Sequence, residues 1–152
     1  MTTYDFKDGN GSVPAHQHSN GGGWVAESAF VAESAFVGPN ARVYGNARVY
    51  DNARVYDYAQ VFDCVRICDN ARVYDCAQVG FNARVYDNAQ VFDNSQVYDG
   101  AQVYGDAKVY FNAQIYGDAQ VYGNAQIYDN AQIYDNARVY DYAQVFDCVR
   151  IC

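Results

Sequence analysis

The sequence predicts an all-β fold, a single-stranded parallel β-helix that is triangular in cross-section and has about seven coils. Three observations predict it. An aliphatic residue returns at every sixth position from Val25 to Ile151, and all 22 of these positions are Val or Ile. The position four residues further on is Ala in 18 of 21 units. No insertion or deletion breaks the period, and a period this strict is typical of repeat architectures.

Each six-residue unit favours a short strand followed by a corner. In Ala47–Tyr50, alternation places the small and aliphatic residues on one face and the polar and aromatic residues on the other. The two residues that follow, Asp51-Asn52, tolerate the positive φ of a turn. A helix is excluded because a six-residue spacing drifts around a 3.6-residue turn, and Val, Tyr and Asn are poor helix formers.

The pattern Val-x-x-x-Ala-x resembles that of the hexapeptide-repeat proteins, over residues 25–152. The resemblance implies a left-handed parallel β-helix, a triangular solenoid with three hexapeptides per coil. Eighteen residues per coil would give seven coils, in a rod roughly 34 Å long at a strand spacing of ~4.8 Å.

Many hexapeptide-repeat proteins are acyl- or nucleotidyl-related transferases. The resemblance implies a His on or beside the coils of such enzymes, usually with a loop excursion and a C-terminal helix. Residues 25–152 contain no His, and their unbroken period leaves no excursion or helical tail. We therefore expect a non-enzymatic member with no catalytic residue, no cofactor and no metal. A hexapeptide acyltransferase is the least favoured alternative, and acyl-CoA-dependent activity would reveal it.

Residues 1–24 form a separate leader that we expect to be extended, rich in Gly, Asn and His and unable to build its own core. Trp24 is expected to close the underside of the first coil. His16 and His18 are the only histidines and could begin a metal site. The alternative is a docked leader in which both histidines are hydrogen-bonded.

Composition limits the partners. The net charge is −8, so nucleic acid is excluded for lack of a basic patch. No apolar run is long enough to span a membrane, and no secretory signal is visible at the N-terminus. An extracellular filament or a virion component is nevertheless the setting that we favour. Residues 40–87 hold six Arg and six Asp, whereas residues 88–137 hold one Lys and six Asp, which we interpret as solvated strand faces.

The five cysteines include two Cys-x-x-x-Cys pairs, at Cys64/Cys68 and Cys148/Cys152. Neither pair has a His or a second Cys pair at the spacing that zinc requires, so we favour free thiols. Intermolecular cross-linking is the alternative, most plausibly at Cys152.

Aromatic residues follow the aliphatic residue in 16 of 18 units between Tyr44 and Phe146. Positions 18 apart should stack, and stacked aromatic and Asn side chains reinforce regular strand piles. The exceptions are Cys68 and Gly80. The sequence predicts two tyrosine ladders, one of Tyr86, Tyr104, Tyr122 and Tyr140 and one of Tyr98, Tyr116 and Tyr134.

The end coils lead to the predicted function. A last coil with unpaired N–H and C=O groups is a template for another chain. Because the array is a whole number of coils, an identical subunit could continue it head to tail, and such a contact gives an open filament. We therefore predict a structural, self-assembling homopolymer, with the leader bridging to a neighbouring copy. The residues expected to carry assembly are Trp24, Val25, Val31, Val37, Arg150, Ile151 and Cys152.

The alternative function is a glycan-binding fibre or adhesin segment, of a phage or a cell surface. Its binding surface would be the exposed Tyr, Asn and Gln side chains, because aromatic rows expose more apolar area than a solitary soluble domain usually tolerates.

One coil-length block is duplicated. Asp51–Cys68 recurs residue for residue as Asp135–Cys152. The offset of 84 residues is 14 units, so we expect the second copy to start on a different face of the rod.

Overall fold

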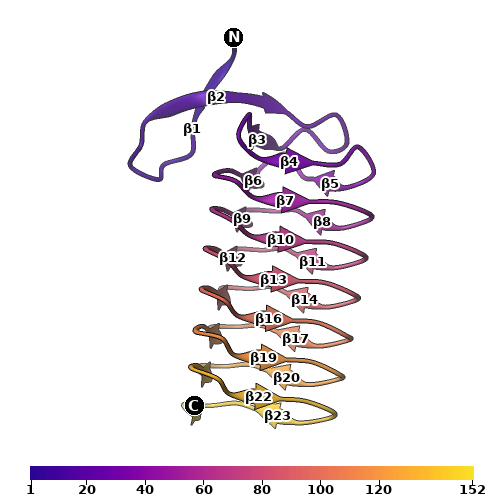
Figure 1. The fold of residues 1–152 in the computed structure, drawn as a ribbon, viewed down its shortest axis with the longest axis vertical. Helices are drawn as coiled ribbons and strands as arrows, with labels where there is room; N and C mark the ends of the chain where they lie inside the picture. The colour runs from indigo at the N-terminus through magenta and orange to yellow at the C-terminus, as the bar shows by residue number, and fades with distance from the viewer.

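The computed structural model describes residues 1–152 and contains β-strands without any helix. The strands stack into a rod with three parallel sheets along its sides, and the two ends of the chain lie at opposite ends of the rod (Figure 1). A parallel β-solenoid of about seven triangular coils is therefore confirmed. Since the strands are the only regular elements, no helix is available to cross a membrane.

The three sheets are named here by their order along the chain. Sheet I has the order β1 (Thr3–Asp5), β2 (Ser12–Gln17), β3 (Trp24–Ala26), β6 (Arg42–Val43), β9 (Gln60–Val61), β12 (Gln78–Val79), β15 (Gln96–Val97), β18 (Gln114–Ile115), β21 (Gln132–Ile133) and β24 (Arg150–Ile151). Sheet II contains β4 (Phe30–Val31), β7 (Arg48–Val49), β10 (Arg66–Ile67), β13 (Arg84–Val85), β16 (Gln102–Val103), β19 (Gln120–Val121) and β22 (Arg138–Val139). Sheet III contains β5 (Phe36–Val37), β8 (Arg54–Val55), β11 (Arg72–Val73), β14 (Gln90–Val91), β17 (Lys108–Val109), β20 (Gln126–Ile127) and β23 (Gln144–Val145).

The register confirms 18 residues per coil. Gln78 of β12 lies opposite Gln96 of β15, and every parallel pair in the solenoid has the same offset. The main core is one cluster of 37 buried residues, all of them Val, Ile or Ala at positions that the period places inward. Ser95 takes the place of Ala and is also fully buried, because its hydroxyl donates to the Phe92 carbonyl at 2.7 Å. The inward face is therefore apolar along the rod apart from the hydrogen-bonded hydroxyl of Ser95.

The corners are formed by residues whose backbone adopts the left-handed conformation, with a positive φ. Every sixth residue from Gly45 to Asp147 has a φ between 53° and 67°, and most of these residues are Asp or Gly. Seven corner aspartates also accept a hydrogen bond from the N–H of the corner residue one coil later, as Asp87 does from Gly105 at 3.0 Å. Asp tolerates this backbone conformation and its carboxylate links successive coils, which explains why the corners are acidic.

The leader forms more structure than the sequence indicates. β1 and β2 make an antiparallel hairpin, and β2 pairs antiparallel with β3 of the first coil. Phe6 and Ala15 of the hairpin are buried in a small cluster with Ala26 and Tyr44 of the solenoid. The expectation of a merely extended leader is therefore incomplete: the leader contains strands, but its apolar contacts are completed by the first coils.

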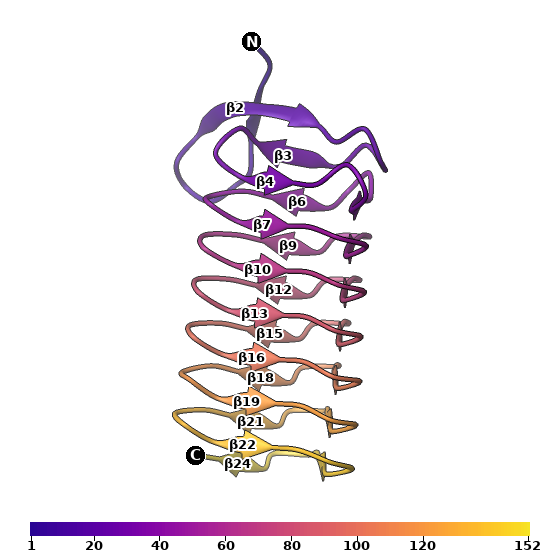
Figure 2. The ribbon, with the colours of Figure 1, turned by 45° about the vertical axis from the view of Figure 1, so that its right-hand side comes forward.

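The leader covers the N-terminal end of its own solenoid (Figures 1 and 2). β2 occupies the open side of β3 in sheet I. Residues 18–23 cover β5 in sheet III, where Val37 donates to the Asn20 carbonyl at 3.0 Å and accepts from Gly23 at 2.9 Å. β4 is the terminal strand of sheet II, with no strand beside it on this side. In this chain the leader docks on its own first coil, and its bridging to a neighbouring copy stays a prediction.

Candidate functional site

The first tyrosine ladder forms as predicted. Tyr86, Tyr104, Tyr122 and Tyr140 follow successive strands of sheet II, with ring centroids 4.8, 4.9 and 5.4 Å apart. The interplanar angles of these pairs are 3°, 6° and 14°, so the rings are stacked. The ladder forms because residues 18 apart in the sequence lie directly above one another on adjacent coils.

The second ladder is shorter than predicted. Tyr116 and Tyr134 stack at 5.4 Å, but the ring of Tyr98 contacts Phe81 at 5.8 Å and Phe62 at 6.0 Å. The cause lies at Gly80, where the missing side chain leaves a gap in the ladder. A Cβ added at Gly80 would lie 2.3 Å from Cε2 of Phe62, so the Phe62 ring fills the space.

A third ladder is the longest, and it is not one of the two predicted above. It follows sheet III, with ring centroids 4.9 to 5.3 Å apart. Its members are Tyr56, Tyr74, Phe92, Tyr110, Tyr128 and Phe146. The same 18-residue spacing predicts it, once Phe is accepted at a Tyr position.

The ladders direct their ring faces toward one another, so a sugar ring has no free face to stack on within an unbroken ladder. The hydroxyl groups are partly engaged as well. Tyr44, Tyr74 and Tyr86 each donate to the Oε1 atom of the Gln sixteen residues later, at 3.3 Å. Burial raises the pKa of Tyr44 and of Tyr74 to about 12. These contacts make the ladders primarily a device for holding coils together.

The predicted assembly residues are divided between the two ends. At the N-terminal end, Val25 and Val37 are fully buried and Val31 packs against the core. Trp24 stacks on Tyr4 of the leader at 4.5 Å, so it contacts the cap and is not free for a neighbour. At the other end, Arg150 and Cys152 are exposed and Ile151 is half-buried.

In the coil that contains β22, β23 and β24, the outward N–H groups have no acceptor within residues 1–152. In earlier coils the polar strand residue and the aromatic residue after it donate to the next coil, as Arg42 does to Ala59 and Tyr44 to Val61. Within residues 1–152 no later coil accepts the corresponding N–H groups of the last one. These groups belong to Arg138, Tyr140, Gln144, Phe146, Arg150 and Cys152. The leader lies at the opposite end and does not shield them (Figure 1).

Both histidines are hydrogen-bonded parts of the docked leader. His18 is buried, and its Nε2 lies 3.0 Å from the Ala35 carbonyl. His16 is exposed, and its Nδ1 lies 2.8 Å from Oε1 of Glu27. The docked arrangement is therefore the one observed, and the structure brings no carboxylate or thiol to both histidines together.

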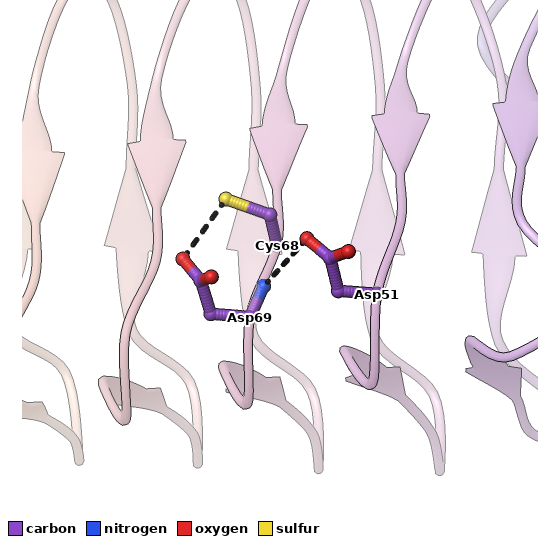
Figure 3. Close-up of side chains that lie close together, drawn as sticks. All are labelled: Asp51, Cys68 and Asp69. Atoms are coloured by element: carbon purple, nitrogen blue, oxygen red, sulfur yellow. Dashed lines mark hydrogen bonds between the residues drawn. The ribbon is translucent and has the colours of Figure 1, made fainter.

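One cysteine lies in a group of side chains that could hold a metal ion. The ligand atoms of Asp51, Cys68 and Asp69 lie within 4.8 Å of one another at a corner between sheets II and III (Figure 3). The Cys68 thiol donates to Oδ2 of Asp69 at 3.4 Å, and Asp69 N–H donates to Oδ2 of Asp51 at 3.4 Å. Burial, followed by that carboxylate, raises the pKa of the Cys68 thiol to about 11. The thiol is thus protonated at neutral pH. The bond from Asp69 N–H to Asp51 is the corner bond that other coils repeat, whereas the thiol contact occurs at this corner alone.

No disulfide forms among the five cysteines within this chain. Cys68 is half-buried. It lies one coil after Tyr50, at a position that most coils fill with an aromatic residue. The exposed cysteines are Cys64, Cys76, Cys148 and Cys152.

Two hollows lie near the N-terminal end. The first, of about 450 Å³, separates the leader from the first coils and is lined by Phe6, Asp8, Glu27 and Tyr44, among others. The second, of about 600 Å³, lies beside sheet II and is lined by Ser28, Phe30, Asn46, Arg48 and Cys64. Neither hollow is predicted from the sequence. The first depends on how the leader docks, and the second is lined by solenoid residues alone.

Comparisons with known proteins give one family. A protein-family model described as the YdcK Beta solenoid repeat matches six overlapping or successive segments that together cover more than half of the chain. The matched residues are 41–56, 47–62, 65–80, 83–99, 113–129 and 131–147. No curated protein and no solved structure matches the chain.

Proposed function

The chain belongs to the YdcK beta-solenoid repeat family, and we propose that it is a structural protein that assembles head to tail with copies of itself into a filament. We also infer that it is a non-enzymatic member of the hexapeptide-repeat superfamily. The six-residue period, with its aliphatic and small residues directed inward, supports that assignment.

The observation that carries the proposal is the row of outward N–H groups on β22, β23 and β24. Each of these strands has a neighbour on one side only within residues 1–152. A strand edge of this kind pairs readily with another chain. All coils share one register, and the solenoid strands from β3 to β24 make seven coils and one further strand. Another copy that is turned by one face of the triangle can therefore continue the stack, with its β3, β4 and β5 beside β22, β23 and β24.

The leader already covers part of the first coil, which is the surface that another copy would contact. It already occupies the open sides of β3 and β5, so a second copy can pair with all three sheets only if the leader leaves. In the proposed filament the last coil of one copy replaces the leader on β3, β4 and β5 of the next. The displaced leader is then free to bridge the junction.

The rod itself suits a structural role. Its core runs without interruption along the solenoid, and its three aromatic ladders stiffen the outside. A glycan-binding role has weaker support, since the faces of the stacked rings are occupied by other rings.

Electron microscopy and analytical ultracentrifugation of the purified protein test the proposal with two substitutions. Gln144→Pro removes an outward N–H at the first residue of β23, where Pro is tolerated, and should abolish filaments. Gly23→Val should promote them, because a Cβ at Gly23 would lie 2.3 Å from the Gly38 carbonyl oxygen and weaken leader docking.

The matched control is Gln144→Arg, which keeps the N–H and introduces a residue found at the same position of β8 and β11. It should assemble like the unmodified chain. If the chain and its Gly23→Val variant both remain monomers or closed trimers at high concentration, the filament proposal fails.

A further inference from the structure

The hollow between the leader and the first coils has the shape and charge of a small binding site. Its volume is about 450 Å³, which is within the range of ligand pockets. Phe6, Asp8 and Asn10 line it from the leader, and Ala26, Glu27 and Tyr44 line it from the solenoid. It exists only while the leader is docked.

The inner part of the hollow is apolar and well supported. Phe6 is buried, and its ring stacks on Tyr44 with centroids 4.9 Å apart. Tyr44 in turn stacks on Phe62 at 5.5 Å. These rings form a preorganised wall, so an apolar group entering the hollow would not need to rearrange it.

The polar part of the lining carries negative charge alone. Asp8 and Glu27 contribute carboxylates, and no Lys or Arg lines the hollow. Nζ of Lys7 contacts Oδ2 of Asp5 at 2.9 Å, and Nη1 of Arg42 donates to the main-chain carbonyl of the lining residue Phe6 at 3.3 Å, so neither cation contacts the Asp8 or Glu27 carboxylate. The hollow therefore has no internal counter-ion.

Both carboxylates keep room for a further hydrogen bond. Oδ1 and Oδ2 of Asp8 accept from the backbone and side chain of Asn10, and these bonds lower the pKa of Asp8. Oε1 of Glu27 contacts His16, which leaves Oε2 without a partner. A carboxylate has about four acceptor positions, so each can accept from an incoming donor as well.

We infer that this hollow binds an organic cation, an ammonium or guanidinium group on a short apolar stem. The stem would contact Phe6 and Tyr44, and the charged group would donate to Asp8 and Glu27. The same chemistry is offered by a free amine and by a Lys or Arg side chain of a protein partner. Because the site needs the docked leader, this inference does not rest on filament formation.

Titration of the full chain with n-butylguanidinium and n-butylammonium, followed by amide chemical shifts in NMR, tests the inference. Saturable shifts are expected at Asp8, Asn10 and Gly45, which all line the hollow. Butyrate and n-butanol are the probes without the cation, and equal binding of either would overturn the inference. A blocked Ala-Arg-Ala peptide distinguishes the sources: binding like n-butylguanidinium supports a protein partner, and exclusion of the peptide while the amines bind supports a free amine.

The repeat supplies a matched control variant. Val-Ala-Glu-Ser-Ala-Phe occurs twice, and Glu27 lines the hollow whereas Glu33 of the second copy does not. Glu27→Gln or Asp8→Asn should weaken binding about 3-fold each, and both together about tenfold, whereas Glu33→Gln should leave it unchanged. Fluorescence of Trp24, the single Trp, verifies leader docking in each variant. Absence of saturable shifts, or an equal loss in Glu33→Gln, would overturn the inference.

Discussion

At the scale of single residues, the corner aspartates combine two roles. Asp87 holds a φ of 58°, and its Oδ2 accepts from Gly105 N–H at 3.0 Å. The sequence indicates the first role, because Asp tolerates positive φ. It does not indicate the second, which depends on the vertical alignment of corners 18 residues apart. The acidic composition is therefore a property of the corners more than of solvated strand faces.

Substitution of Asp87 separates these roles. Asp87→Gly keeps the backbone conformation and loses the hydrogen bond, so unfolding free energy should fall by about 1 kcal/mol. Asp87→Ala adds the cost of a left-handed non-glycine residue, for a total loss of about 2 to 3 kcal/mol. Asp87→Asn should change little. Urea denaturation measures all three, and equal losses for Gly and Ala would show that backbone strain is not involved.

At the scale of elements, the ladders show where sequence reasoning succeeds and where it stops. The 18-residue spacing is enough to predict the stack from Tyr86 to Tyr140. It cannot predict that Tyr98 leaves its stack, because this depends on the rings of Phe62 and Phe81 around Gly80. The leader hairpin is not predictable for a similar reason. Its apolar residues are buried only because they pack against Ala26 and Tyr44, which belong to the solenoid.

Restoring the regular six-residue unit at Gly80, where the tyrosine ladder of sheet I lacks a ring, should stabilise the rod. Gly80→Tyr with Phe81→Asp returns an aromatic residue to the ladder and removes an aromatic residue from a φ of 60°. Phe111→Asp is the matched control, since Phe111 has a φ of 53° in a coil whose ladder residue, Tyr110, is present. The control should gain about 1 kcal/mol from relief of strain.

The double variant should gain about 0.5 to 1.5 kcal/mol beyond that control, through a new aromatic pair. Thermal and urea unfolding measure both gains. A double variant no more stable than Phe111→Asp would mean that Phe62 cannot vacate the space beside Gly80.

The ladders should also make the rod sensitive to alkali. Burial raises the pKa of Tyr74 from 10.0 to about 12, so the folded state keeps the hydroxyl protonated where the unfolded chain ionises. This contribution is fully present below pH 10 and is lost as pH rises from about 10 to 12. Unfolding monitored by circular dichroism should show the loss, and Tyr74→Phe should reduce it. Phe already occupies the neighbouring ladder position at Phe92. An unchanged alkaline profile in Tyr74→Phe would assign the effect to other groups.

At the scale of the whole molecule, the coil is the unit of stability. Each coil contacts only its neighbours, so stability is close to a sum over coils. Deletion of residues 99–116 removes one coil and joins Tyr98 to Gly117 in register. The shortened rod should remain folded, lose about one-seventh of its unfolding free energy and shorten by ~4.8 Å in small-angle scattering.

Deletion of residues 99–107 is the contrasting case. It removes half a coil and joins Tyr98 to Lys108, which displaces every later inward residue. Circular dichroism should show loss of cooperative unfolding in this variant alone. Equal behaviour of the two deletions would contradict a coil-based account.

The duplicated block gives the rod two identical stretches in different surroundings. Val65 of Asp51–Cys68 is fully buried, whereas its counterpart Val149 in Asp135–Cys152 is 46% exposed. A reagent that recognises this stretch by sequence therefore meets one enclosed copy and one accessible copy on every molecule. The ratio of reagent bound at Asp135–Cys152 to reagent bound at Asp51–Cys68 then reports how often the coil around Val149 is covered by another chain.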